Sequence, residues 1–143
     1  MSTDPGTADP RDAEPRRRRT LIGLLIPADP DRAVTLCRVP DRIAAISDTL
    51  GAHLLDDVTV LLPCGELICL YRSEEYARLP DNPRLAVVLT RLGVSDRQLQ
   101  AALRGDALVL GSTSTGTVVD LDVPDHVVTA CRRCGIIPIL TTS

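Results

Sequence analysis

The chain has 143 residues, 44% of them hydrophobic, which is enough for one domain with one sizeable core. Its formal net charge is −3, so a grip of the whole domain on nucleic acid is not expected. No apolar run approaches the ~20 residues that span a bilayer, and the first residues lack the apolar segment of a secretory signal. We therefore expect a cytoplasmic protein that does not contact a membrane.

Residues 1–19 are polar, rich in proline and charge, and contain no aliphatic residue larger than alanine after Met1. Such a segment cannot bury enough apolar surface to offset the entropy of ordering, so we predict a disordered, arginine-ended tail. The tail carries five arginines against four acidic residues, whereas residues 20–143 carry eleven against fifteen. We predict that residues 20–143 form a single α+β domain.

Four consecutive arginines end the tail. They are Arg16, Arg17, Arg18 and Arg19. On a flexible segment they either make weak contact with nucleic-acid phosphates or only keep the tail solvated, because four cations are too few for tight binding.

The first half of the domain alternates apolar runs with turn signals. The runs at 21–26 and 34–39 flank a turn rich in proline and aspartate, which predicts a β-hairpin. A Pro-Asp pair then opens a helix that ends at Gly51. Further runs at 58–62 and 67–71 surround a Pro-Cys-Gly turn and predict a second hairpin.

In the second half, the Asn-Pro pair at 82–83 is the best helix start, because asparagine caps a helix and proline tolerates its first position. A capping box at Ser95 predicts another short helix. Runs at 107–110 and 117–121 predict a third hairpin, and a last helix through Cys134 precedes an edge strand. The predicted fold class is therefore α+β, with about three β-hairpins and four short helices.

Five cysteines without a secretory signal indicate reduced thiols rather than a disulfide framework. Cys131 and Cys134 have the spacing of a zinc knuckle, and Cys64 and Cys69 could supply a second pair. The alternative is structural, because helical spacing would turn both Cys131 and Cys134 towards the core as small apolar side chains. We expect no cofactor, and the pair remains a candidate metal site.

The richest polar stretch lies between the second hairpin and the helix that starts at 82–83. It predicts a recognition surface for a protein or a small anionic ligand, because Tyr and Arg are the usual anchors of such surfaces. The alternative is a charged connection whose tyrosines are half-buried. The candidate binding residues are Tyr71, Arg72, Tyr76, Asn82 and Arg84.

No recognisable catalytic pattern is present in the sequence. His53 and His126 belong to no metal or triad motif, so we expect both at the surface. Ser112 and Ser114 lie in a glycine-flanked loop that matches neither a phosphate-binding loop nor a nucleophile elbow. We predict that the protein is not an enzyme.

Four segments occur in the same order as in an uncharacterised-domain family of short proteins common on phages, plasmids and other mobile elements. These segments are LLIPADP (24–30), YRSEEYARLPDNPRLAVVL (71–89), GDALVLG (105–111) and DVPDHVV (122–128). The chain resembles this family over roughly residues 20–128, whereas the CRRCG segment lies outside the resemblance.

The resemblance implies a small, non-catalytic accessory protein of a mobile element, acting by binding a protein partner. A protein that binds a small, nucleotide-like ligand is the first alternative, and a zinc-dependent interaction module is the second. Short hairpins with open edges would also permit a homo-oligomer.

Overall fold

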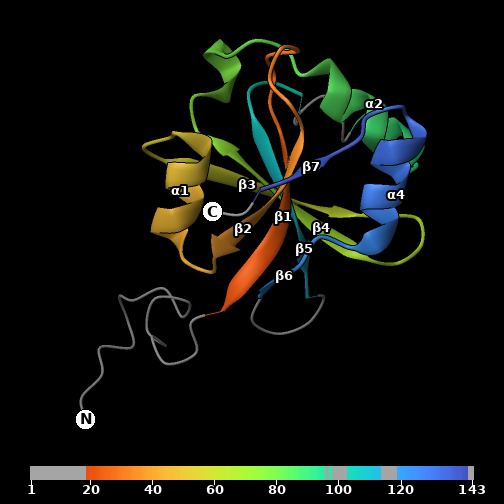
Figure 1. Ribbon diagram of the computed structural model, residues 1–143, viewed down its shortest axis with the longest axis horizontal. Helices are drawn as coiled ribbons and strands as arrows, with labels where there is room; N and C mark the ends of the chain where they lie inside the picture. The colour runs from red at the N-terminus through yellow and green to blue at the C-terminus, as the bar shows by residue number, and fades with distance from the viewer. Residues whose placement is uncertain (1–18, 96, 98–102, 114–118, 142–143) are drawn as a thin grey trace.

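The computed structural model describes residues 19–95, 97, 103–113 and 119–141. Within these residues, seven strands form a single sheet, flanked by three α-helices and one 3-10 helix (Figure 1). The strands are β1 (Thr20–Ile26), β2 (Thr35–Pro40), β3 (Leu55–Leu61), β4 (Leu67–Ser73), β5 (Ala107–Ser112), β6 (Asp120–Leu121) and β7 (Ile139–Leu140). The helices are α1 (Ile43–Leu50), η2 (Tyr76–Arg78, the 3-10 helix), α2 (Pro83–Arg91) and α4 (Asp125–Arg133).

The strand order is β3-β4-β5-β1-β2-β7, with β6 beside β5. The pairs are antiparallel except for β2 and β7, which run parallel. The predicted fold class of three hairpins with four short helices is therefore wrong as an architecture. The expected strand partners do pair, but β5 inserts between β4 and β1 and joins them into one mixed sheet.

The reason for this difference lies in β5. All six of its residues are buried, so the strand is covered on both faces as only an interior strand can be. A hairpin prediction considers only neighbours in sequence and cannot show that β5 meets β1, more than 80 residues earlier. The predicted helix at Ser95 falls mostly on residues 96 and 98–102, outside the described residues, so the described part contains three α-helices rather than four.

Helices cover both faces of the sheet, with α1 on one side and α2 and α4 together on the other (Figure 1). Side chains of β5 show the alternation that this requires. Ala107 and Val109 enter the core beneath α2 and α4, whereas Leu108 and Leu110 enter the core beneath α1. The core beneath α2 and α4 is aliphatic apart from Cys131, whereas the core beneath α1 also contains two cysteines and Tyr71. The sheet between them gives the domain three layers.

The start of α2 confirms its predicted cap. The side chain of Asn82 accepts a hydrogen bond from the backbone N–H of Leu85, and Pro83 occupies the first helical turn. The predicted final edge strand is also present, because β7 pairs only with β2 within the described sheet. Arg19, the last residue of the predicted tail, donates to the carbonyl of Asp120 at 3.0 Å. The rest of that tail lies outside the described residues.

Gly111 allows β6 to approach the middle of the sheet. A Cβ on Gly111 would lie 2.6 Å from the backbone oxygen of Asp122, whereas one on Gly23 would meet the side chain of Leu108 in β5, 2.7 Å from its Cδ1. At this point β1 leaves β5, and the chain after β6 bonds to it instead: Val123 N–H donates to the Ile22 carbonyl at 2.8 Å.

Replacing Gly111 with alanine is expected to lower the free energy of unfolding by about 1 to 3 kcal/mol, because the added Cβ overlaps a backbone atom that cannot rotate away. Chemical denaturation would measure this loss, and amide exchange at Val123 should accelerate. Gly23→Ala is the comparison, since Gly23 also lies in a strand without a positive φ, and its added Cβ would meet the movable end of the Leu108 side chain rather than backbone, so the loss should be smaller. Unchanged exchange at Val123 would contradict the predicted displacement of β6.

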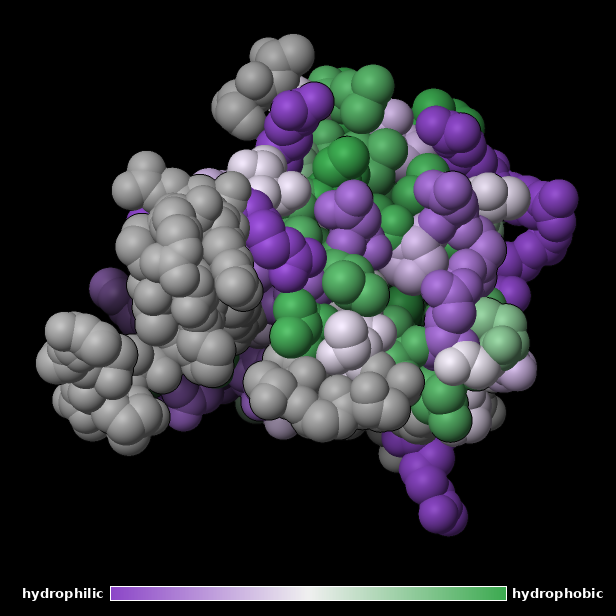
Figure 2. All heavy atoms as spheres, turned by 90° about the horizontal axis from the view of Figure 1, so that it is seen from below, coloured by the Kyte–Doolittle hydropathy of each residue, from purple (hydrophilic) through white to green (hydrophobic). Residues whose placement is uncertain are grey.

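Among the described residues, no helix is both long and apolar enough to cross a membrane. Figure 2 shows a band of hydrophobic side chains, bordered by hydrophilic ones, on the face seen from below. The exposed large apolar residues of the described part are Ile22, Leu54, Leu61, Val87, Leu121, Ile137, Ile139 and Leu140. They lie on β1, β3, β6, β7 and α2 or next to these strands, and the homo-oligomer remains a prediction.

Candidate functional site

A pocket of about 330 Å³ opens beside the end of α1. Its walls come from four parts of the chain: the β1–β2 loop (28–29), the end of α1 (50–53), the segment after β4 (73–80) and the turn before β5 (105–106). Segments 24–30, 71–89 and 105–111, which carry the sequence resemblance, each contribute to this wall. The sheet order explains their meeting, because it places β4, β5 and β1 side by side.

The ionisable side chains that line the pocket are three carboxylates and one imidazole: Asp29, Glu75, Asp106 and His53. The carboxylate of Asp106 accepts hydrogen bonds from the backbone N–H of Ala28 and from the guanidinium of Arg32, each at 2.9 Å. Asp29, Glu75 and His53 are exposed. The pocket therefore has an acidic mouth, with one carboxylate already paired.

Asn82 holds two walls of this pocket together. Its Nδ2 donates to the carbonyls of Ile26 and Gly105, both at 2.9 Å, while its Oδ1 caps α2. The side chain is 1% exposed, so these bonds replace water completely. Its position joins the end of β1, the turn before β5 and the start of α2.

Arg84 holds the β1–β2 loop in place through hydrogen bonds to its backbone. Its Nη2 donates to the carbonyl oxygens of Pro27, Asp29 and Arg32 at 2.8, 2.9 and 2.8 Å. Nη2 carries only two hydrogens, so the three carbonyls share them, and this one nitrogen ties the loop together. The donor groups of the predicted binding residues Asn82 and Arg84 thus bond to backbone oxygens next to the pocket.

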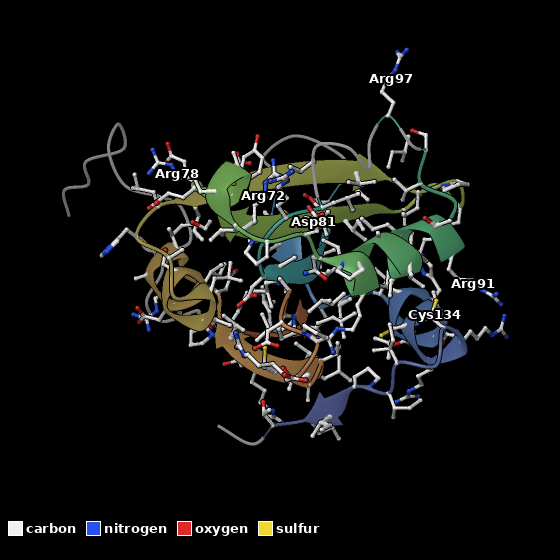
Figure 3. The ribbon with its side chains drawn as sticks, turned by 90° about the horizontal axis from the view of Figure 1, so that it is seen from above. Arg72, Arg78, Asp81, Arg91, Arg97 and Cys134 are labelled. Carbon is white, nitrogen blue, oxygen red and sulfur yellow. The ribbon has the colours of Figure 1, made fainter. Side chains whose placement is uncertain are left out.

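The other predicted binding residues do not share one surface. Tyr71 is buried beneath α1 and donates its hydroxyl to Asp120 at 2.7 Å. Arg72 is buried and bonds through Nε and Nη2 to Asp56 at 2.8 Å, with Tyr76 stacked at 3.5 Å from its guanidinium carbon. Figure 3 shows Arg72 beside η2, whereas Arg78 extends outwards. A ligand role for this set remains a prediction, because the structure ties its members to the fold.

All five cysteines lie in the described part, and none forms a disulfide. Cys131 is fully buried in the core and donates to the carbonyl of Ile136 at 3.3 Å, and Cys134 Sγ faces the carbonyl of Val87 at 3.8 Å. Burial raises the pKa of Cys131 to about 11. A thiol held protonated in this way is a poor ligand, because metals bind the thiolate. The zinc prediction for Cys131 and Cys134 gains no support from this geometry and stays a prediction.

A different set of side chains has metal-ligand spacing. Among the described residues, one group of three potential ligand residues brings its donor atoms within 4.8 Å of one another: Cys64, Glu66 and His126. Cys69, the expected companion of Cys64, is buried in the core on the α1 side. Sequence reasoning missed this group because His126 is 62 residues from Cys64 and belongs to no local motif.

Sequence reasoning also missed the pocket. Four of its contributors, Asp29, His53, Glu75 and Asp106, occur singly and at ordinary turn positions. The sequence signal that could have pointed to the pocket was the family resemblance, because three of its segments contribute to the pocket wall. The strand order brings these segments together, and the sequence does not show that order.

No family model and no curated protein matches the sequence. The fold is similar to part of a solved structure, the crystal structure of small RNA methyltransferase HEN1, with a TM-score of 0.56 and 16% sequence identity. The match covers 90% of this chain but only 18% of that chain. At this identity the likeness shows a shared fold.

Proposed function

We propose that this protein is a non-catalytic binding protein whose protein partner inserts a positively charged side chain into the acidic pocket. The observation that carries the proposal is the lining itself, in which three carboxylates gather around about 330 Å³ of space. The pocket is large enough for one arginine or lysine side chain, and carboxylates are the natural partners of both. The binding role is the one that the sequence resemblance implies, and the mobile-element context rests on that resemblance alone.

The arrangement of charges favours a cationic occupant over an anionic one. A phosphate would approach Asp29 and Glu75, both exposed, and would find the nearby guanidinium of Arg32 engaged by Asp106. Nη2 of Arg84 is occupied by three carbonyls, and Arg104 contacts Asp81 and the carbonyl of Ala77. Like charges in such a site repel, so a nucleotide-like ligand is disfavoured. Methyl transfer is not proposed, because the likeness to a methyltransferase covers 18% of that chain.

A titration followed by ¹H–¹⁵N correlation spectra tests the proposal with defined probes. N-acetyl-arginine methylamide should shift the amide signals of Ala52, His53 and Gly105, whereas N-acetyl-glutamate methylamide should not. Asp29→Asn and Glu75→Gln should each weaken the binding by up to about fivefold, because an exposed ion pair contributes ~0.2–1 kcal/mol.

Asp125→Asn is the matched control, since this exposed carboxylate begins α4 on the other side of the sheet. It should leave the arginine titration unchanged. Pocket shifts produced by ATP but not by the arginine probe would replace the proposal with the nucleotide-like alternative. If neither probe shifts the pocket signals, the cation-binding proposal fails. If the arginine probe does bind, a pull-down comparing the native chain with the Asp29→Asn/Glu75→Gln double variant would identify the pocket-dependent partner.

A further inference from the structure

Three side chains of different chemistry meet on the side of the sheet covered by α2 and α4. Cys64 and Glu66 lie in the turn between β3 and β4, and His126 lies in the first turn of α4. The sulfur of Cys64 is 3.5 Å from Nε2 of His126, and Oε1 of Glu66 is 3.0 Å from Nδ1 of the same ring. The imidazole thus lies between a thiol and a carboxylate.

The contact between Nδ1 of His126 and Glu66 favours one tautomer of the ring. A carboxylate oxygen can only accept, so a hydrogen on Nδ1 suits its position 3.0 Å from Oε1 of Glu66. In the neutral ring this leaves the lone pair on Nε2, and Nε2 is the atom that faces Cys64. A carboxylate on the far nitrogen is the usual way in which proteins orient a metal-binding histidine.

The distance between the two donor atoms suits a tetrahedral metal ion. Zinc lies about 2.3 Å from a cysteine sulfur and about 2.0–2.1 Å from a histidine nitrogen, so a tetrahedral angle places these atoms about 3.5 Å apart. The observed separation of Sγ and Nε2 is 3.5 Å. We propose that Cys64, His126 and Glu66 form a binding site for a zinc-like divalent transition-metal ion.

In this site Cys64 and His126 bind the ion directly. Glu66 holds the ring through Nδ1, and its oxygen also lies within 4.8 Å of both other donor atoms. The Glu66 side chain is 55% exposed and that of His126 is 37% exposed, so an ion can enter from solvent and keep water in its remaining positions. A site with open positions suits reversible binding, whereas closed four-ligand sites are structural.

Both segments that supply the ligands are anchored in the same core. Leu62 is buried there, and its backbone N–H donates to the carbonyl of Glu66 at 2.8 Å, which closes the turn around Cys64. Val127, the residue after His126, is buried in that core as well. The donor atoms are therefore placed by ordered backbone, and a bound ion would link the β3–β4 turn to the start of α4.

Cobalt(II) titration of the full chain tests the proposal, because a thiolate bound to cobalt absorbs in the near ultraviolet. The native protein should develop this absorption, and excess zinc should remove it. The variant Cys64→Ser should lose the absorption, and His126→Ala should lose most of the affinity. Cys134→Ser is the matched control, since Cys134 is the other cysteine that is not buried, and it should behave like the native protein.

The role of Glu66 in orienting His126 can be tested separately. Glu66→Ala should weaken cobalt binding by about 10- to 100-fold, the usual loss when a carboxylate that orients a metal-binding histidine is removed. Glu66→Gln keeps an oxygen acceptor for Nδ1 and should lose less. Zinc should also raise the melting temperature of the native chain, and EDTA should reverse the rise.

Two results would overturn the proposal. One is an absorption that persists in Cys64→Ser but disappears in Cys134→Ser, which would assign the metal to the Cys131–Cys134 pair. The other is the absence of any thiolate-to-cobalt absorption in the native chain at millimolar cobalt. Neither result bears on the acidic pocket, which has a different set of ligating residues.

Discussion

Replacing Asn82 with alanine is expected to lower the free energy of unfolding by about 3 to 5 kcal/mol. The change removes the cap of α2, which is worth about 1 kcal/mol, and leaves the buried carbonyls of Ile26 and Gly105 without this donor, at about 1–2 kcal/mol each. Urea denaturation followed by circular dichroism would measure the loss. The magnitude reflects a side chain that is 1% exposed and makes all its bonds inside the protein.

The neighbouring residue provides the control. Asp81 is highly exposed, and its carboxylate is 3.5 Å from Arg104 in an exposed ion pair, so Asp81→Ala should cost less than about 1 kcal/mol. Asn82→Asp separates the two roles of asparagine, because aspartate can cap α2 but presents only acceptors to the two carbonyls. It should be at least as destabilising as alanine. A loss below about 1 kcal/mol for Asn82→Ala would show that the buried carbonyls find other donors.

The stability of the native chain should fall by about 2 kcal/mol between pH 9 and pH 11 through Cys131 alone. Burial is the main cause that raises the pKa of this thiol from its ordinary value of 9.0 to about 11. Below pH 9 the thiol is protonated in both states, so its contribution is complete. Between pH 9 and 11 the unfolded chain loses the proton while the folded chain keeps it, and each pH unit then costs about 1.4 kcal/mol.

The measurement is the difference in unfolding free energy between the native chain and Cys131→Ser, taken from pH 8 to pH 11. Groups common to both proteins cancel in this difference, including Cys37, whose pKa burial also raises. Serine does not titrate here, so the advantage of the native chain should shrink as the pH rises. Cys134→Ser should retain most of the pH dependence. A difference that stays constant to pH 11 would show that the Cys131 thiol is not protected from water.

Asn82, Arg84 and Arg72 show what the fold adds to a sequence prediction of binding residues. In the sequence they stand among charged residues with two tyrosines nearby, which is typical of a recognition surface. In the structure Asn82 and Arg84 bond to carbonyls, and Arg72 is buried against Asp56. The sequence shows which side chains can donate hydrogen bonds. Only the fold determines whether their acceptors belong to the protein or to a ligand.

The sequence by itself determined the local elements. Periodic apolar residues predicted the strands of β1 to β5, and the Asn-Pro pair predicted the start of α2, because caps and alternation depend on neighbours a few residues apart. The tertiary structure alone decided that β5 lies between β4 and β1, and that Cys64 meets His126 from 62 residues away. Such contacts depend on which buried faces pack together, and a local sequence pattern does not show which faces these are. The pocket and the proposed metal site both arise from this second kind of contact.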